Sequence, residues 1–242
     1  MAISANIGTL YGISVGTGDP ELITVKGVKL LQKSPIVAFP AGTKGKLGIA
    51  QKIVSQWLQP NQVTLALDFP YVFDRKTLQA AWTVSAKQVL NCLQQGQDVA
   101  FACEGDISFY STFTHLARTI TQLQPSVKIT TIPGVCSPVA AAADLGIPLT
   151  VNQEKILIIP ALYTIEDLET ALNSAEVIVL LKVSRVYQQV WQILQKHDLL
   201  THSSVVIKAS SSDRKYYTDL TNYPNLQLPY FSLLIVSRIS PN

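Results

Sequence analysis

The sequence predicts an α/β protein with a parallel sheet in its first half and a mixed sheet in its second half. The chain has 242 residues, a length that suits two modest α/β domains or one large one. Its first half alternates short apolar runs with amphipathic segments, as βαβ units do. Its last strand-like runs follow one another without a helix between them, so we expect them to be antiparallel. We therefore expect two domains, 1–124 and 125–242.

The first domain is predicted from periodicity and helix-end signals. Pro20–Lys33 spaces its apolar residues as an amphipathic helix does. Asp19 suits the N-cap, Pro20 the first helical position, and Glu21 the positive end of the helix dipole. The other predicted elements are strands Leu10–Gly16, Pro35–Phe39, Val63–Leu67 and Val99–Cys103, and helices Ile49–Leu58 and Lys76–Gln95.

The second domain is expected to begin where QLQPS (122–126) interrupts the alternation. A strand, Val127–Ile132, leads into a turn and a helix of small residues that stops at Gly146. The later predicted elements are strands Ile156–Ile159, Val177–Val183, Ser204–Lys208, Lys215–Leu220 and Phe231–Ile239, and helices Ile165–Leu172 and Val186–Lys196.

Composition argues against several classes of protein. Charged residues make up 14% of the chain, hydrophobic residues 48%, and the formal net charge is +3 without a Lys/Arg run, which does not favour a nucleic-acid partner. The start lacks the pattern of a signal peptide, and no apolar run approaches the ~20 residues of a membrane span. Cys92, Cys103 and Cys136 are far apart and not clustered with histidines, so we expect reduced thiols in a cytoplasmic protein, without zinc or disulfides.

Four predicted strand ends carry residues that a strand end does not need. Ligands of open α/β sheets bind outside the carboxyl ends of strands. The Gly16–Pro20 segment lacks the third glycine of a dinucleotide fingerprint, and Pro20 removes an N–H, while Gly42–Lys46 lacks the spacing of a phosphate-binding loop. Tight turns and helix caps are the plain alternative for such residues. The four ends are Val15–Pro20, Cys103–Asp106, Ile132–Ser137 and Leu180–Lys182.

Three stretches resemble one known family. LYGISVGTGDPELITVKGVKLLQKSPIVAFP is similar to the N-terminal signature of the cobalamin-pathway tetrapyrrole methylases, which are S-adenosylmethionine-dependent methyltransferases. DVAFACEGDISFYSTFTHL resembles their central Gly-Asp motif, in the form of the C-20 methylase branch. VKITTIPGVCSPVAAAADLGIPL resembles their Pro-Gly strand-to-helix junction. The resemblance runs from Gly8 to about Lys208, and Ile107 stands where the family usually has proline.

The resemblance implies a two-domain fold with a site in the cleft between the domains. S-adenosyl-L-methionine would bind there and leave as S-adenosyl-L-homocysteine. Gly105 would let the backbone approach the ligand, and Asp106 would accept hydrogen bonds from the methionine amino group. The other implied residues are Ser108 and Tyr110 at the amino-acid part, Cys136 and Ser137 at the methionine moiety, Leu181, Lys208 and Ala209 at the adenosine, and Thr17 in the first loop.

The function implied is methyl transfer to C-20 of precorrin-2 or of its cobalt-bearing oxidised counterpart. The tetrapyrrole carries many carboxylates, for which exposed basic side chains are candidates, although such side chains are ordinarily just solvated. No side chain is singled out as a general base. Ser108, Ser111 and His115 are close together in the sequence, and we interpret the hydroxyls as caps of a helix. The alternatives are a methylase of another ring carbon and a non-catalytic sensing module, and a homodimer is expected. The basic candidates are Lys44, Lys46, Lys182 and Arg185, followed by Arg214 and Lys215.

Overall fold

The computed structural model describes residues 7–42, 46–70, 74–160 and 165–238. The chain divides into two compact units, Met1–Cys136 and Ser137–Asn242. The division falls later than the boundary of 124/125 expected from the sequence. The reason is that β5 (Ile129–Ile132) pairs in parallel with β1 (Leu10–Ser14) and so belongs to the first sheet.

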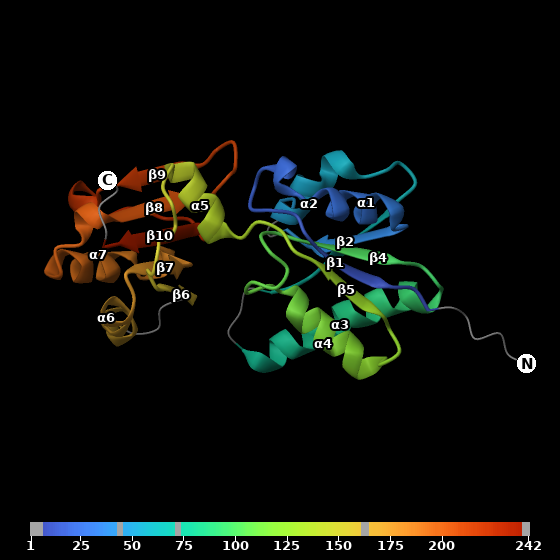
Figure 1. Cartoon of the computed structure of the whole chain (residues 1–242). Coiled ribbons are helices and arrows are strands. Elements are labelled where there is room, and N and C mark those ends of the chain that lie inside the picture. Colours follow the sequence, from blue (N-terminus) through green and yellow to red (C-terminus); the bar gives the residue numbers. More distant parts are fainter. Residues whose placement is uncertain (1–6, 43–45, 71–73, 161–164, 239–242) are drawn as a thin grey trace, which may run out of the picture. The chain divides into compact units, whose positions relative to one another are not determined.

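The first unit contains a parallel five-stranded sheet in the order β3-β2-β4-β1-β5 (Figure 1). β1 lies between β4 (Val99–Cys103) and β5, so the carboxyl ends of these three strands are neighbours. The outer strands are β2 (Ile36–Pro40) and β3 (Val63–Leu67). This arrangement confirms the predicted parallel sheet, and β3 and β4 have the predicted bounds.

Helices cover both faces of this sheet, as Figure 1 shows. One apolar cluster joins the sheet to the pair α1 and α2, and another joins the opposite face to α3 and α4. Successive strand residues alternate between the two clusters, as period-2 geometry requires: Phe101 belongs to the second and Ala102 to the first. The helices are α1 (Val25–Lys33), α2 (Ile49–Val54), α3 (Arg75–Gln94) and α4 (Phe113–Leu123).

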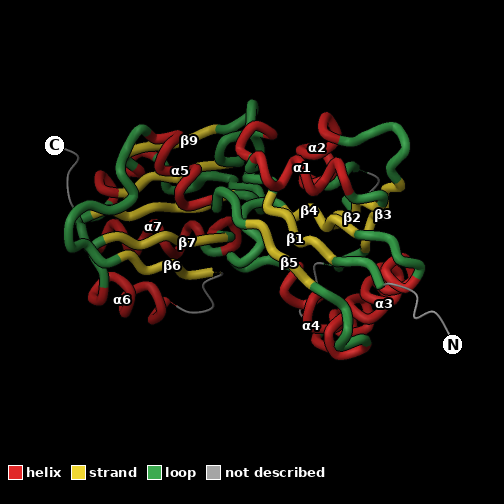
Figure 2. The backbone as a smooth tube through the Cα atoms, turned by 45° about the vertical axis from the view of Figure 1, so that its right-hand side comes forward, coloured by secondary structure: helices red, strands yellow, loops and turns green. Residues whose placement is uncertain are grey.

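The second unit contains a mixed sheet in the order β6-β7-β10-β8-β9 (Figure 1), whose strands are yellow in Figure 2. β6 and β7 are parallel, whereas β10 is antiparallel to both β7 and β8, and β9 is antiparallel to β8. The expected antiparallel ending is therefore confirmed. The strands are β6 (Ile156–Pro160), β7 (Val177–Leu181), β8 (Ser203–Ile207), β9 (Lys215–Thr218) and β10 (Ser232–Ser237), and the helices are α5 (Ser137–Leu145), α6 (Ile165–Ser174) and α7 (Tyr187–Lys196).

Three helices differ from the prediction. The first is α2, which ends at Val54 and is followed by a 3₁₀ turn, Ser55–Trp57, instead of reaching Leu58. Pro20–Lys33 is not one helix: a 3₁₀ turn, Pro20–Leu22, is followed by α1, because the Thr24 hydroxyl accepts a hydrogen bond from Gly27 N–H and caps a new helix start. Asp19 does accept from Glu21 N–H, but it caps only the short turn. The third difference is α4, whose start the sequence indicated through its hydroxyls but to which it gave no bounds.

Gly12 is required by the packing of α4 against the sheet. A Cβ at this position would lie 2.6 Å from ring carbons of Phe113, whose side chain is buried against Phe101. We expect Gly12→Ala to lower the free energy of unfolding by about 1–3 kcal/mol through overpacking. Denaturant unfolding measures this loss. Adding Phe113→Leu should cost less in the Gly12→Ala background than in the wild type, and strictly additive losses would contradict the proposed contact.

Candidate functional site

The carboxyl ends of β1 and β4 are tied together by two glycines. Gly105 N–H donates to the carbonyl oxygen of Gly16 at 2.7 Å, and both residues have positive φ, 71° for Gly105 and 78° for Gly16. Such a backbone conformation favours glycine. The predicted site residue Thr17 follows Gly16 directly and is partly buried. The two glycine turns that the sequence singled out therefore form one structure.

Asp106 connects this structure to the end of β5. Its Oδ2 accepts a hydrogen bond from Gly134 N–H at 2.7 Å, and its Oδ1 accepts from Ser108 N–H at 2.8 Å and from the Ser108 hydroxyl. Burial by itself would raise the pKa of Asp106, but the hydrogen bonds from Ser108 and Gly134 outweigh it and lower the pKa. Asp106 is thus an ionised carboxylate that already has several donors from its own chain.

Ser14 lies beneath Asp106 and bridges the same three strand ends. Its side chain is fully buried, and its hydroxyl accepts from Ile107 N–H at 2.7 Å and donates to the carbonyl oxygen of Ile132 at 2.7 Å. Its Oγ is also 3.4 Å from Asp106 Oδ2. A Cβ on Gly134 would lie 2.5 Å from the Cβ of Ser14, so glycine is needed there. Sequence reasoning missed Ser14, although a hydroxyl within an apolar strand was visible.

Glu104 and Cys103 are the other polar residues at the end of β4. Burial raises the pKa of the Glu104 carboxyl, and Glu104 Oε2 has neither solvent contact nor a hydrogen-bond partner in the part of the chain that the structure describes. Burial, followed by the neighbouring Glu104 charge, raises the pKa of the Cys103 thiol to about 12. Cys103 Sγ lies 3.1 Å from the Ser111 hydroxyl. The thiol is therefore a poor nucleophile at neutral pH.

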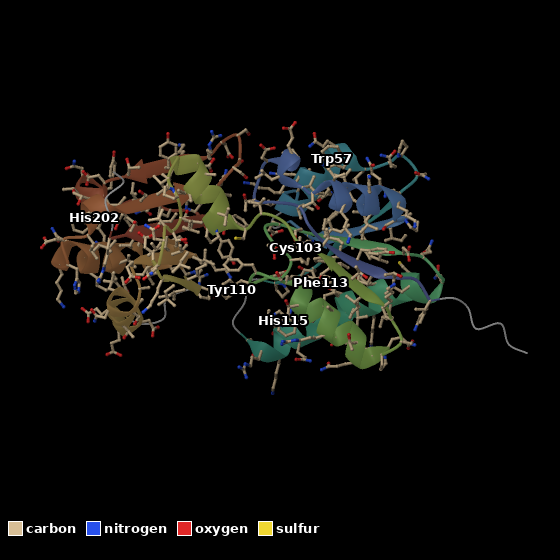
Figure 3. The ribbon with its side chains drawn as sticks, viewed as in Figure 1. Trp57, Cys103, Tyr110, Phe113, His115 and His202 are labelled. Carbon is tan, nitrogen blue, oxygen red and sulfur yellow. The ribbon has the colours of Figure 1, made fainter. Side chains whose placement is uncertain are left out.

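The segment after Asp106 leads into α4. Ser111 Oγ accepts from Phe113 N–H at 3.0 Å at the start of this helix, while its N-cap residue, Thr112, makes no side-chain capping hydrogen bond. Figure 3 labels Cys103 at the end of β4 and Phe113 and His115 on α4. The His115 ring stacks on Trp82 of α3, with centroids 4.1 Å apart. Tyr110 is exposed and has a left-handed backbone, with φ of 51°.

The second unit carries the remaining predicted cofactor residues. β10 lies between β7 and β8, so its first residues separate Leu181 and Lys182, after β7, from Lys208 and Ala209, after β8. Lys208 N–H donates to the carbonyl oxygen of Phe231 at 2.8 Å, and Lys182 Nζ lies 5.6 Å from the centre of the Tyr230 ring. Lys182 and Lys208 both have positive φ, a strained conformation for such residues that is typical of functional sites.

The predicted residues thus fall into two groups, one in each unit. Thr17, Gly105, Asp106, Ser108 and Tyr110 lie at the carboxyl end of the first sheet. Leu181, Lys182, Lys208 and Ala209 lie at the corresponding end of the second sheet, and Arg185 follows in the turn after β7. Cys136 is the last residue of the first unit, and Ser137 begins α5 in the second unit. Tyr230 is a neighbour of the second group that the sequence reading did not name.

The basic candidates differ in what surrounds them. Lys44 lies outside the described residues, and Lys46, Lys182, Arg185 and Lys215 are exposed. Arg214 is engaged: its Nε lies 3.1 Å from Asp144 Oδ1, and Asp144 also accepts from Ser210 N–H. Lys208 forms an ion pair with Asp213, whose pKa falls to about 2 through hydrogen bonds from Lys208 and Ser211. Arg214 and Lys208 are therefore each engaged with an acidic side chain of the protein itself.

Two further findings concern the whole described chain. Across residues 7–42, 46–70, 74–160 and 165–238, no three His, Cys, Asp or Glu side chains gather as a metal site would require. No helix in these ranges has both the length and the apolar character needed to cross a membrane.

The sequence matches relatives along almost its whole length. The family model described as "Tetrapyrrole (Corrin/Porphyrin) Methylases" matches residues 9–222. A Mycobacterium bovis protein named "Cobalamin biosynthesis protein CobIJ" is 29% identical over 95% of this chain, and the chain spans about half of that relative's length, 46%. A Methanocaldococcus jannaschii protein named "Probable cobalt-precorrin-2 C(20)-methyltransferase" is 29% identical, covering 95% of this chain and 96% of the relative. A Sinorhizobium protein named "Precorrin-2 C(20)-methyltransferase" is 28% identical, covering 95% of both.

Solved structures with the same fold have more distant sequences. A cobalt precorrin-4 methyltransferase structure has a TM-score of 0.69 and 23% identity, covering 95% of this chain and 94% of the other. A uroporphyrin-III C-methyltransferase from Thermus thermophilus, in complex with S-adenosylhomocysteine, has a TM-score of 0.67 and 17% identity, covering 95% and 97%. These two likenesses support the fold.

The bridging role of Ser14 can be tested by removing its hydroxyl. In Ser14→Ala the buried N–H of Ile107 loses its acceptor, so we expect a loss of about 1–3 kcal/mol in the free energy of unfolding. Ser85→Ala is the matched control, because Ser85 is equally buried but makes a single long hydrogen bond of 3.4 Å to Asp68. Urea unfolding compares the two variants. Equal losses would show that the Ser14 bridge adds nothing beyond an ordinary buried serine.

Proposed function

Because the chain belongs to the tetrapyrrole (corrin/porphyrin) methylase family, we propose that it transfers a methyl group from S-adenosyl-L-methionine to C-20 of precorrin-2 in cobalamin biosynthesis. The observation that carries this proposal is the match of nearly the whole chain to relatives named for that reaction. Those names include both the cobalt-bearing and the metal-free substrate. We propose the C-20 position for this chain and leave both forms of the substrate as candidates.

The residues at the end of the first sheet fit a methyl donor of this kind. A Cβ built on Gly105 would meet no atom within 4 Å, so this glycine faces open space, whereas Gly16 and Gly134 face packed neighbours. A ligand can therefore approach the Gly105 backbone closely. Next to it, Glu104 Oε2 has no hydrogen-bond partner among the described residues, and Tyr110 is exposed. We propose that the methionine part of the donor lies along Gly105–Tyr110.

Asp106 acts on the donor mainly by shaping this loop. Its oxygens already accept hydrogen bonds from Gly134 and from Ser108, which hold the turn at Gly105 in one conformation. A carboxylate has about four lone-pair sites, so one more donor, the methionine amino group, can still be accepted. The contact between Asp106 and the methionine amino group, which the resemblance implies, is therefore compatible with the structure. Asp106 has the additional role of holding the turn at Gly105.

The chain needs little acid–base chemistry for the transfer itself. The sulfonium group of S-adenosyl-L-methionine supplies a methyl carbon that is already electrophilic. The work of the protein is to bind both reactants, align them and exclude water, and such orientation can supply on the order of 7–11 kcal/mol. The backbone around Gly105 and Ser108 orients one reactant, and we propose that exposed cations orient the carboxylates of the other. The cations are Lys46, Lys182 and Arg185, with Lys44 outside the described residues.

We further propose a cytoplasmic homodimer. The three cysteines are unpaired in the structure, as expected in a reducing compartment. Exposed apolar side chains such as Val25, Val63 and Val84 are candidates for contact with a second copy. Light scattering on the purified protein measures the mass, and a monomer at micromolar concentration would contradict the dimer.

The proposed activity can be measured directly. With methyl-labelled S-adenosyl-L-methionine and precorrin-2, or its cobalt complex, we expect label in the tetrapyrrole, and NMR should locate it at C-20. Label at another ring carbon would instead identify a methylase of a different position. Binding of the tetrapyrrole without transfer of label from either substrate would favour a sensing module and would contradict the proposal.

Gly105→Ala tests the proposed donor contact, with Gly146→Ala as its control. Both glycines have positive φ, 71° and 67°, and a Cβ at either position meets nothing within 4 Å, so the backbone strain, about 1–2 kcal/mol, should be similar. Gly146 ends α5, away from the Gly105–Tyr110 loop in sequence. We expect Gly105→Ala alone to weaken S-adenosyl-L-homocysteine binding, by tenfold or more by calorimetry. Unchanged affinity in Gly105→Ala would place the donor elsewhere.

A further inference from the structure

We propose that Glu104 is the catalytic base that accepts the proton released from C-20 of the substrate. This inference rests on the proposed function and extends it. Methylation of a meso carbon that carries hydrogen forms a new carbon–carbon bond, while the electron pair of the broken carbon–sulfur bond stays on sulfur. The C-20–H bond must then break, its electrons return to the ring system, and one proton leaves. No other reactant is needed, but the proton needs an acceptor.

The backbone places Glu104 between the ends of β1 and β2. Val15 N–H donates to Cys103 at 3.0 Å and Gly105 N–H donates to Gly16 at 2.7 Å, so the pairing with the β1 end continues on both sides of Glu104. Glu104 is the bend residue directly after β4, which lies between β1 and β2 in the sheet. The residue directly after it is Gly105, where a Cβ would meet no atom within 4 Å.

An unpartnered carboxyl oxygen in this position requires an explanation. Buried polar atoms in folded proteins nearly always have a hydrogen-bond partner, and leaving one unsatisfied costs about 1–3 kcal/mol. Among the described residues, Glu104 Oε2 is a buried side-chain oxygen atom that has no hydrogen-bond partner. A residue of this kind beside a proposed ligand loop is a candidate for a group that acts only when the ligand is present.

The neighbouring ionisable groups are less suited to accept the proton. Asp106 is held ionised by several hydrogen bonds, which lower its pKa and its basicity. The Cys103 thiol stays protonated, since burial raises its pKa to about 12. His115 lies on α4 with its ring stacked against Trp82. Asp19 accepts a hydrogen bond from the Glu21 N–H and caps a 3₁₀ turn.

The surroundings also give Glu104 suitable basicity. Burial raises the pKa of its carboxyl, which brings it nearer to neutral pH, where general bases work best. The ionisable neighbours in contact along β4 are Cys103, which is neutral at that pH, and Asp106, which is negative. A carboxylate there gains basicity from desolvation, and because the residue as a whole is only partly buried, it can release the proton to solvent after the product leaves.

The test compares Glu104→Gln with the wild type and with Glu21→Gln, which removes an exposed carboxylate after the end of β1. We expect Glu104→Gln to lower kcat by about 10²–10⁴-fold, the usual contribution of a general base, and to leave S-adenosyl-L-homocysteine affinity unchanged. Wild-type kcat should rise with pH as Glu104 ionises, and this limb should disappear in the variant. Substrate deuterated at C-20 should show a larger isotope effect in Glu104→Gln than in the wild type.

A second readout does not depend on turnover. The infrared difference between wild type and Glu104→Gln should show a protonated carboxyl band that persists above the ordinary glutamate pKa of about 4.3. Wild-type kcat in Glu104→Gln, or an unaltered pH limb, would overturn the role of Glu104 while leaving the methyltransferase assignment intact. If Glu104→Gln lost both cofactor binding and stability, Glu104 would have a structural role, and the proposal would likewise be overturned. Absence of transfer by the wild type would instead refute the proposed function.

Discussion

The hydrogen bonds between the ends of β1, β4 and β5 are the constraint on which the rest of the candidate site depends. Ser14 contributes a fully buried hydroxyl, Asp106 an ionised carboxylate, and Gly134 a backbone N–H. Each partner comes from a different strand end, so no strand end can move without breaking a buried hydrogen bond, at a cost of about 1–3 kcal/mol each. The turn at Gly105 is therefore held in place before any ligand arrives, which is the condition for catalysis by orientation.

Two adjacent carboxylates at the end of β4 have opposite surroundings. Asp106 receives hydrogen bonds that lower its pKa, whereas Glu104 is partly buried, its Oε2 has no partner among the described residues, and desolvation raises its pKa. Surroundings that separate the pKa values of two carboxyl groups in this way are typical of sites where one group holds the structure in place and the other exchanges a proton. The same short segment, Cys103–Asp106, thus carries both the rigidity of the loop and its reactive group.

The sequence predicted the class of fold, and it singled out the Gly-Asp turn of the candidate site, because the relevant signals are local. Strand Val99–Cys103 is a buried apolar run ended by a turn, and it was predicted with its observed bounds. The features that the sequence did not reveal depend on contacts made in the folded chain. β5 joins the first sheet by pairing with β1, which places the division between the units after β5. Thr24 caps a new helix start and so divides the expected first helix. The Gly-Asp turn was recognised, but its partner Gly134 is 28 residues away. The sequence indicated the start of helix α4 but not its extent, because the hydroxyl-rich segment before it obscured the spacing of Phe113, Leu116 and Ile120.

The central claim is that the pre-formed turn at the end of β4 binds the methyl donor. Amide hydrogen exchange measured with and without S-adenosyl-L-homocysteine tests it most directly, because it reports the protection of each backbone segment. We predict that the ligand slows exchange at residues 104–110, which include the turn at Gly105. Slower exchange confined to other segments, with 104–110 unchanged, would contradict the account.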